Sequence, residues 1–494
     1  MRPGMILFSV VVLFLCAGIL TPKEMLEGFS NKGMITVALL FLVSEGIRQS
    51  GTLGQVIKKL LPQGKTTVFK AQLRILPSVA FISAFLNNTP VVVIFAPIIK
   101  HWAKSVNLPA TKFLIPLSYV TILGGICTLI GTSTNLVVHG MILEAGFEGF
   151  SMFELGKVGV FIAIAGIIYI FLFSKRLLPD ARPDTAVPDE EIEEGEKFHR
   201  VEAVLGARFP GINKKLKDFN FQRHYGAEVK EIKTRNGQRF VTNLDDVVLH
   251  EGDTLVVMAD DTFIPTWGES SVFVLLTNGN EPDTSGKKKR WFALLLLVLM
   301  IVGATVGELP VTKEMFPDIK LDMFFFVSIT TIIMAWTNLF PARKYTKYIS
   351  WDILITIACA FAISKAMVNS GVADSVAKFI IGLSDDYGPH VLLAMVFIIT
   401  NLFTELITNN AAAALAFPLA LSISAQLGVS PTPFFVVICM AASASFSTPI
   451  GYQTNLIVQG IGNYKFTDFV RIGLPLNIIT FLISVILIPL IWNF

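Results

Sequence analysis

Short polar motifs occur twice in this chain, each time inside an apolar stretch. The first pair is Asn87-Asn88-Thr89 and Thr408-Asn409-Asn410, and the second is Gly131-Thr132-Ser133-Thr134-Asn135 and Gly451-Tyr452-Gln453-Thr454-Asn455. Both second copies follow their first copies at nearly the same offset in residue number. Unwound backbone at membrane depth exposes carbonyl oxygens suited to a hard cation such as sodium, and neighbouring helix N-termini present positive dipole ends to an anion. The motifs therefore indicate that a cation and an anion bind together.

The hydrogen-bond donors in these motifs are neutral, because neither pair contains a Lys or an Arg. They are backbone N–H groups and amide and hydroxyl side chains, namely Asn88, Asn409, Asn410, Thr89, Ser133, Thr134, Thr408 and Thr454. A multiply charged anion held by neutral donors needs co-bound cations to offset its charge. This favours symport over uniport, and sodium suits ligands that are all oxygen.

One acidic residue lies close to the second copy of the first motif pair. Glu405 is the sole acidic residue between Asp386 and Asp468, one turn before Thr408. An ionisable residue at membrane depth is a functional candidate. Two roles are open, stabilising a cation site or hydrogen-bonding the backbone there. Glu45 and Lys365, at equivalent positions of the two copies, are expected to have structural roles near the membrane edges.

The composition is that of a membrane protein. The chain is 53% hydrophobic and 16% charged, and the whole stretch from Leu406 to Asn463 is free of charge. Uncharged runs of this length need a nonpolar solvent. The four cysteines lie inside apolar segments without metal-ligand spacing, so they predict helix packing and neither a disulfide framework nor a zinc site; they are Cys16, Cys127, Cys359 and Cys439.

One region in the middle of the chain has a different composition. Residues 175–290 carry 39 of the 77 charged side chains. Strand-like runs alternate there with turn signals such as Arg235-Asn236-Gly237. We expect an acidic linker at 176–196, a small α/β domain at 197–280 and a basic linker at 281–290.

The remaining segments thread as two membrane repeats, 1–175 and 291–494. Basic residues cluster in the loops near Lys58, Lys175 and Arg343, and the positive-inside rule makes those loops, and with them the inserted domain, cytoplasmic. Each repeat then contains a re-entrant hairpin and a broken span. The hairpins are expected at about 72–103 and 390–426, and the broken spans at about 112–143 and 432–462.

The fold class expected is therefore an α-helical polytopic membrane protein with two inverted repeats, an inserted cytosolic α/β domain and an external C-terminus. Further spans are expected near residues 5–20, 34–50, 157–174, 291–307, 322–340, 350–368 and 471–493. The second repeat has one span more before its hairpin than the first. Either the repeats are unequal or a span precedes Met1 in the natural gene product.

The arrangement of hairpins, tips and broken helices resembles the divalent-anion/sodium symporter (DASS) family of the ion transporter superfamily, over nearly all of the membrane portion. The resemblance implies one sodium site from Asn88 with the Gly131 region and a second from Asn409 with the Gly451 region. It also implies that the tips face the anion, with the carrier working as an elevator on a dimeric scaffold. The sodium ligands expected are Asn88, Gly131, Asn135, Thr408, Asn409, Gly451 and Asn455, and the anion ligands are Asn87, Asn88, Thr89, Ser133, Thr134, Asn409, Asn410 and Thr454.

Two motifs depart from the dicarboxylate carriers of that family. Those carriers have Ser-Asn-Thr at the tips and Thr-Pro-Pro-Asn at the breaks, whereas this chain has Asn87-Asn88-Thr89 and Thr132-Ser133-Thr134-Asn135 in its first repeat. The departures resemble the sulfate-permease branch, whose members often carry cytosolic inserts.

The insert resembles the C-terminal ligand-binding module of potassium-conductance regulators (RCK-C). The matching features include Val201 to Leu205, Tyr225 to Val229 and Leu249 to Leu255. Such modules dimerise, and some bind cyclic di-AMP. From this resemblance we expect a cytosolic dimer. Its two linkers tether it to the last span of the first repeat and the first span of the second, so we expect it beneath the scaffold.

The leading hypothesis is a sodium-coupled symporter of a divalent anion, with sulfate as the favoured anion, in the cell (inner) membrane. Its expected partners are sodium, the anion, membrane lipid and a second copy of the chain, and no nucleic acid. A dicarboxylate carrier, another carrier of the superfamily and a membrane anion receptor remain alternatives. An enzyme is not expected, since the insert has no nucleophile elbow, phosphate loop or metal-ligand spacing.

Overall fold

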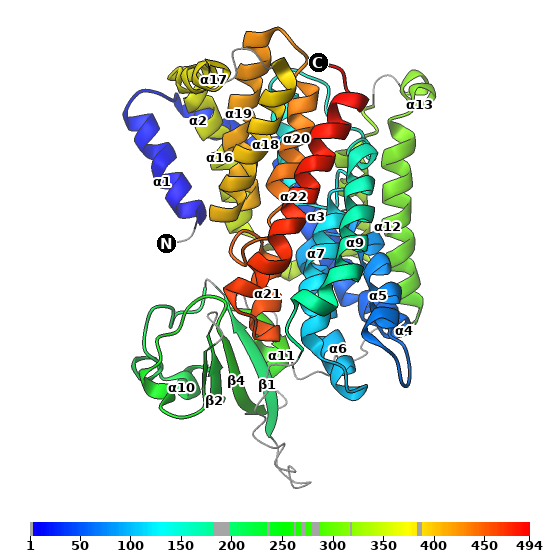
Figure 1. Ribbon diagram of the computed structural model, residues 1–494, viewed down its shortest axis with the longest axis vertical. Coiled ribbons are helices and arrows are strands. Elements are labelled where there is room, and N and C mark those ends of the chain that lie inside the picture. Colours follow the sequence, from blue (N-terminus) through cyan, green and yellow to red (C-terminus); the bar gives the residue numbers. More distant parts are fainter. Residues whose placement is uncertain are drawn as a thin grey trace.

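The computed structural model describes residues 3–180, 198–206, 208–234, 238–260, 263–267, 272–277, 287–316, 319–382 and 388–494. Long helices form a bundle, and a small β-sheet lies against one end of it (Figure 1). Within the described part of the chain, seven helices are long and apolar enough to cross a membrane. A multi-pass membrane protein follows from these lengths and compositions.

The helices before the sheet are α1 (Pro3–Cys16), α2 (Pro22–Glu27), α3 (Lys32–Gln49), α4 (Thr52–Leu60), α5 (Val68–Ser83), α6 (Asn88–Ser105), α7 (Leu114–Gly125), α8 (Ser133–Glu144) and α9 (Gly156–Leu177). Their boundaries follow local chemistry. The side chain of Asn31 accepts hydrogen bonds from the backbone N–H groups of Gly33 and Met34 and so caps α3. Gly51, with φ of 70°, separates α3 from α4 because a left-handed residue ends a helix.

The helices after the sheet are α12 (Lys287–Gly307), α13 (Pro310–Met315), α14 (Met323–Trp336), α15 (Tyr345–Tyr348), α16 (Trp351–Asn369), α17 (Val372–Gly382), α18 (Gly388–Leu406), α19 (Asn409–Leu427), α20 (Thr432–Ser443), α21 (Gln453–Gly462) and α22 (Phe466–Ile491). Gly371, with φ of 72°, separates α16 from α17 as Gly51 separates α3 from α4 in the first half of the chain.

Matching helices of the two halves have matching neighbours. Helix α5 packs on α7 as α18 packs on α20, and α3 packs on α14 as α16 packs on α1. Across the halves, α6 packs on α21 as α19 packs on α8, while α9 and α22 pack on each other. Each half thus completes its packing with helices of the other.

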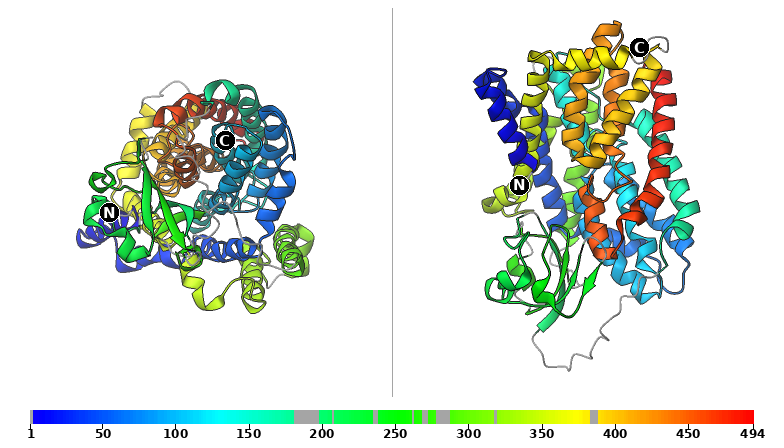
Figure 2. Two further views of the ribbon diagram at one scale, coloured as in Figure 1. Left: turned by 90° about the horizontal axis from the view of Figure 1, so that it is seen from below. Right: turned by 60° about the vertical axis from the view of Figure 1, so that its left-hand side comes forward.

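The helix pairs α5–α6 and α18–α19 open toward opposite ends of the bundle. Helices α5 and α6 lie toward the sheet, whereas α18 and α19 lie toward the end that holds α17 and the C-terminus (Figures 1 and 2). Their turns fall at residues 84–87 and at Ile407-Thr408, where the polar tips of the motifs occur. Non-helical segments, called the first and the second break below, separate α7 from α8 and α20 from α21, at the second pair of motifs.

The sheet has five strands, β1 (Phe198–Leu205), β2 (Glu228–Lys233), β3 (Arg239–Phe240), β4 (Thr254–Asp260) and β5 (Phe273–Thr277), in the order β3-β2-β4-β1-β5. All these pairings are antiparallel. Short helices α10 (Phe221–Tyr225) and α11 (Phe263–Trp267) pack with it. The sheet has a hydrophobic core of its own, in which Phe209 packs against Phe219 and Tyr225.

The sheet is expected to lie beneath the scaffold, and the structure shows which helices it touches. It contacts α6 and α21, which carry residues of the polar motifs, through β5 and β1. A shielded ion pair between the sheet and α6 holds it there, and sequence spacing does not reveal that pair. Most of the acidic linker, the first part of the basic linker and the turn Arg235-Asn236-Gly237 lie outside the described residues.

Candidate functional site

Four helix N-termini meet where the motifs lie. Helices α6 and α19 begin at the hairpin tips, and α8 and α21 begin just after the two breaks between helices. The residues before these helices are Asn87, Thr132, Thr408 and Tyr452, and none of the four makes a side-chain capping hydrogen bond. The first N–H groups of a helix have no partner within it, so such ends attract anions.

Each hairpin tip contacts the break of the opposite half. The amide of Asn88 donates to Tyr452 Oη at 2.7 Å, and Thr89 Oγ1 donates to Gln453 Oε1 at 3.4 Å. Asn409 Nδ2 donates to Thr134 Oγ1 at 2.8 Å. The two breaks also touch, since the hydroxyls of Thr132 and Tyr452 are 2.9 Å apart.

The second asparagine of hairpin α18–α19 also bonds to the first break. The two tips and the two breaks thus form a set of hydrogen-bonded residues, called the ring below. Asn410 Oδ1 accepts hydrogen bonds from Ser133 Oγ at 3.2 Å and from Thr134 Oγ1 at 3.3 Å. Thr454 is the second residue of α21, and its hydroxyl accepts a 2.8 Å bond from Ser118 of α7. The structure therefore brings together the tip and break residues that the sequence nominated for the anion.

Asn87 occupies the edge of this ring. It and Ser133 line a cavity of about 10 Å³, whose remaining walls come from α3, the first hairpin, the first break, the start of α8 and Leu297 of α12. A space of this size holds about one water molecule. A cavity of this size is too small for an oxyanion.

Backbone oxygens converge at the first break. A Cβ placed on Gly131 would lie 2.6 Å from the carbonyl oxygen of Gly125 and 2.9 Å from that of Ala84. A Cβ placed on Gly125 would lie 2.7 Å from Asn88 Oδ1 and 3.1 Å from the carbonyl oxygen of Gly131. Glycine at both positions thus leaves room for four oxygens around one small volume.

The side chain of Asn135 donates hydrogen bonds to the backbone of this break, while its oxygen accepts none from the described residues. Its Nδ2 donates to the carbonyl oxygen of Thr128 at 2.8 Å, and Gly131 N donates to Thr128 Oγ1 at 3.1 Å. The Asn135 side chain is fully buried, and its Oδ1 has no hydrogen-bond partner among the described residues. A buried oxygen without a donor is suited to a cation.

The second break repeats the pattern with additional side-chain oxygens. Asn455 Nδ2 donates to the carbonyl oxygens of Ser445 at 2.8 Å and Thr448 at 3.1 Å, as Asn135 does with Gly125 and Thr128. A Cβ placed on Gly451 would lie 2.1 Å from Ser445 Oγ and 2.3 Å from the carbonyl oxygen of Thr404.

The second tip supplies a further oxygen without a donor. The Oγ1 atom of Thr408 is buried and has no hydrogen-bond partner among the described residues.

Glu405 hydrogen-bonds the second break. Its Oε1 accepts from the backbone N–H of Ser447 at 2.9 Å and from Asn477 Nδ2 at 2.7 Å. Its Oε2 accepts from Ser445 Oγ at 3.4 Å, so both of the roles expected for Glu405 are compatible with its position. The equivalent place in the first half is taken by Phe85, which carries no charge.

Glu45 and Lys365 lie away from the motifs. Glu45 forms an ion pair with Arg48 at 2.7 Å within α3, and the side chain of Lys365 is exposed.

Sequence reasoning did not nominate several residues that contribute to the site. They are Ala84, Gly125, Thr128, Tyr452, Gln453, Thr404, Ser445 and Thr448. Six of them form three pairs at the offset of the break motifs, Ala84 with Thr404, Gly125 with Ser445 and Thr128 with Thr448. Applying that offset to the residues around each motif would have found them.

Comparison with known proteins gives a family and several relatives. The family model described as citrate transporter matches residues 1–426 and 319–494. An uncharacterized transporter of Synechocystis sp. is 30% identical over 98% of this chain and 93% of its own length. Sodium/sulfate cotransporter 2 of Chlamydomonas reinhardtii is 31% identical over 57% of this chain and 31% of its own length. A third relative, named probable sodium/sulfate cotransporter 3 of the same alga, is 23% identical over 96% of this chain and 84% of its own length.

Proposed function

This chain belongs to the citrate transporter (CitMHS) family, and on that premise we propose that it is a secondary active symporter of sodium and a divalent oxyanion, with sulfate as the favoured substrate. Two relatives support both the cation and the anion, because their names are sodium/sulfate cotransporters. The observation that carries the proposal is the meeting of four uncapped helix N-termini beside two oxygen-lined breaks.

The anion site is proposed at the ring of tips and breaks. The donors there are backbone N–H groups and the neutral side chains of Thr89, Ser133, Thr134, Asn410 and Thr454. Four positive helix ends supply roughly half an elementary charge each at most. Together they offset at most about two elementary charges, so co-bound cations supply whatever part of a divalent anion's charge the helix ends leave unmatched.

Sodium is proposed at each break. In the first half the ligands would be Asn88 Oδ1, the carbonyl oxygens of Ala84, Gly125 and Gly131, and the donor-free Asn135 Oδ1. In the second half they would be the carbonyl oxygen of Thr404, Ser445 Oγ and the donor-free Thr408 Oγ1, with Asn409, Asn455 and the Gly451 backbone beside them. Both sets of ligands fit sodium because every ligand is an oxygen atom. When bound, sodium would neutralise part of the anion's charge.

An inverted repeat and an elevator motion are proposed for the membrane part. The matched packing of the two halves and the opposite entry of the two hairpins support the inverted repeat. Each broken helix packs against the hairpin of its own half before the break and against the hairpin of the other half after it, which supports their motion as one body. We propose a homodimer with the insert in the cytoplasm as an RCK-C-like unit that takes a nucleotide such as cyclic di-AMP. The insert's separate hydrophobic core supports its folding as a unit.

Citrate or another carboxylate is the second candidate, because the matching family model is that of citrate transporters. A tricarboxylate site commonly uses Arg for planar, bidentate recognition of carboxylate. Neither motif pair of this chain contains Arg or Lys. Sulfate is smaller and accepts hydrogen bonds from all sides.

Competition in proteoliposomes tests the proposal. Purified protein takes up radiolabelled sulfate under an inward sodium gradient, with unlabelled sulfate, succinate, citrate and arsenite as competitors. We expect uptake that needs sodium and is inhibited most strongly by sulfate. Stronger inhibition by citrate or succinate would transfer the assignment to a carboxylate, and saturable binding without accumulation would indicate a receptor.

A further inference from the structure

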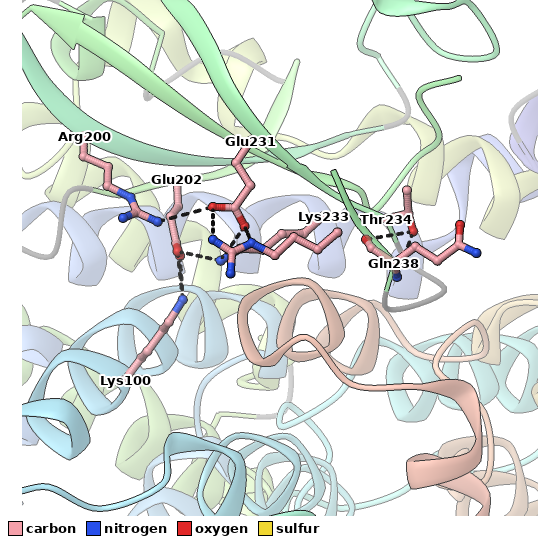
Figure 3. Close-up of polar contacts among 8 residues, drawn as sticks. Lys100, Arg200, Glu202, Glu231, Lys233, Thr234 and Gln238 are labelled. Atoms are coloured by element: carbon pink, nitrogen blue, oxygen red, sulfur yellow. Dashed lines mark hydrogen bonds and ion pairs between the residues drawn. The ribbon is translucent and has the colours of Figure 1, made fainter. Parts of the chain in front are cut away.

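The sheet and the first hairpin are joined by an ion pair. Lys100, near the end of α6, donates from Nζ to Glu202 Oε1 at 2.8 Å and to Oε2 at 2.9 Å. Figure 3 shows Lys100 extending from its helix toward Glu202 on strand β1. Both side chains are largely shielded, with 22% and 18% of their surfaces exposed. A shielded ion pair is screened less by salt than a surface pair and fixes the position of its two elements more firmly.

A network of hydrogen bonds and ion pairs within the sheet also holds the Glu202 side chain in place. Lys233 of β2 donates to Glu202 Oε1 at 3.3 Å, and the side chain of Lys233 is only 4% exposed. Glu231, equally buried, accepts from Arg239 Nη2 at 2.9 Å. It also lies 3.5 Å from Arg200 Nη2 (Figure 3). Burial alone would raise the pKa of Glu202, but Lys100 and Lys233 lower this pKa to about 2, so the carboxylate stays charged.

A second contact joins the sheet to α21. Gly252, with φ of 85°, lies against the side chain of Leu456, since a Cβ on Gly252 would be 2.8 Å from Leu456 Cδ1. One turn further along α21, a Cβ on Gly460 would lie 2.8 Å from Thr254 Oγ1 and 3.2 Å from the carbonyl oxygen of Gly252. Strand β4 and the turn before it are therefore in van der Waals contact with the helix.

The two helices that the sheet contacts begin in the functional site. Helix α6 runs from Asn88 to the ion pair at Lys100, a distance of about 18 Å for twelve residues at 1.5 Å each. Helix α21 runs from Gln453 to the sheet contact at Gly460, about 10 Å by the same rise. Helix α21 is a continuous α-helix without proline from Gln453 to Gly460, so it joins site and sheet without a hinge. Helix α6 is also continuous over these described residues, but it contains Pro97, which removes one backbone hydrogen bond between Asn88 and Lys100.

We propose that the sheet is fixed to the cytosolic ends of α6 and α21 and moves with them during transport, so that binding to the sheet in the cytosol can bias the position of the site. This proposal rests on the elevator motion proposed above. A ligand or partner of the sheet changes transport only if it binds one position of the moving body better than the other. The contacts of the sheet with α6 and α21, both of which begin in the site, are what make the sheet part of the moving body.

A disulfide across the second contact tests the proposal. Gly460→Cys and Thr254→Cys are introduced in a chain whose four native cysteines are replaced by alanine. The 2.8 Å approach of a Gly460 Cβ to Thr254 Oγ1 places the two Cβ atoms within the range that a disulfide spans. We expect the disulfide to form in the membrane and sulfate uptake to stay within twofold of the reduced protein. Failure to form it, or a loss of uptake greater than tenfold that reduction restores, would overturn the proposal.

The ion pair is tested in the same background. Lys100→Gln should slow formation of this engineered disulfide at least fivefold, and Lys58→Gln should leave it unchanged. Lys58 is an exposed lysine of the neighbouring α4 with no ion pair among the described residues. Equal rates in the two variants would show that the attachment of the sheet does not depend on Lys100. The disulfide rates report the contact even if the parent shows no sodium-dependent uptake, an outcome that would instead reject the proposed function.

Discussion

Gly131→Ala is expected to weaken the sodium dependence of transport without preventing folding. The added Cβ would lie 2.6 Å from the carbonyl oxygen of Gly125, 2.8 Å from Gly125 Cα and 2.9 Å from the carbonyl oxygen of Ala84, whereas ordinary contacts of a Cβ are 3.4–4 Å. All three neighbours are backbone atoms, which cannot rotate away. The methyl group therefore enters the volume around which the proposed sodium ligands converge.

The size of the effect follows from the cost of overpacking, about 1–3 kcal/mol for an added methylene in a packed site. If that strain falls on the sodium-bound state, the affinity for sodium decreases by about 5- to 150-fold, at tenfold for each 1.4 kcal/mol. Sodium titrations of sulfate uptake measure this as a shift of the half-saturating concentration. Protection of the detergent-solubilised protein by sodium against thermal unfolding gives a second readout that does not need transport.

Gly382→Ala is the matched control, because no heavy atom of the described residues lies within 4 Å of a Cβ placed at Gly382, and the residue ends α17. It should leave both readouts unchanged. The reasoning would be refuted by a Gly131→Ala protein that folds and whose sodium dependence, in uptake and in protection, stays within twofold of the parent.

Three further predictions concern the tips and the attachment of the sheet. Asn88→Ala and Asn409→Ala should each raise the sodium concentration needed for half-maximal uptake, since each removes an amide beside a proposed sodium site, and unchanged sodium curves in both would reject the assignment. Thr89→Val and Asn410→Ala should instead change sulfate affinity, or the choice between sulfate and succinate, at unchanged sodium dependence, as competition assays measure. The pKa of Glu202 is lowered from 4.5 to about 2, so its contribution to stability is present above pH 4.5 and is lost as pH falls toward 2. To test this, the protein with Thr254→Cys and Gly460→Cys is equilibrated at each pH and then oxidised at one fixed pH. Cross-linking should be equal from neutral pH down to about 4.5 and weaker below it, and a decrease already above pH 5 would contradict this.

The matching of the two halves could be predicted from the sequence because both halves end and interrupt their helices with the same kinds of residue. Gly51 and Gly371 both take positive φ at a helix end. Polar tips and breaks inside apolar runs are tolerated in a membrane only where the backbone is buried in protein or lines a cavity. The helix pairs and interruptions lie within a few residues of the ranges expected from these motifs.

The cross-contacts between halves could not be read in the same way. Tyr452 occupies the position equivalent to Thr132, yet its longer side chain reaches both Thr132 and Asn88. That reach depends on how the two halves are docked, which a linear pattern does not contain. The contact of the sheet with α6 could not be read from the sequence for a related reason, because Lys100 and Glu202 look like ordinary surface charges until the fold brings them to 2.8 Å.

The central claim is that sodium and an oxyanion move together through the ring of tips and breaks. The most direct measurement is the accumulation of radiolabelled sulfate in proteoliposomes driven by an inward sodium gradient alone, at equal pH on both sides. Accumulation above the external sulfate concentration, which collapses when the sodium gradient is dissipated and disappears in Gly131→Ala at low sodium, is the predicted result. Sulfate that only equilibrates, or accumulates equally well without sodium, would contradict the account.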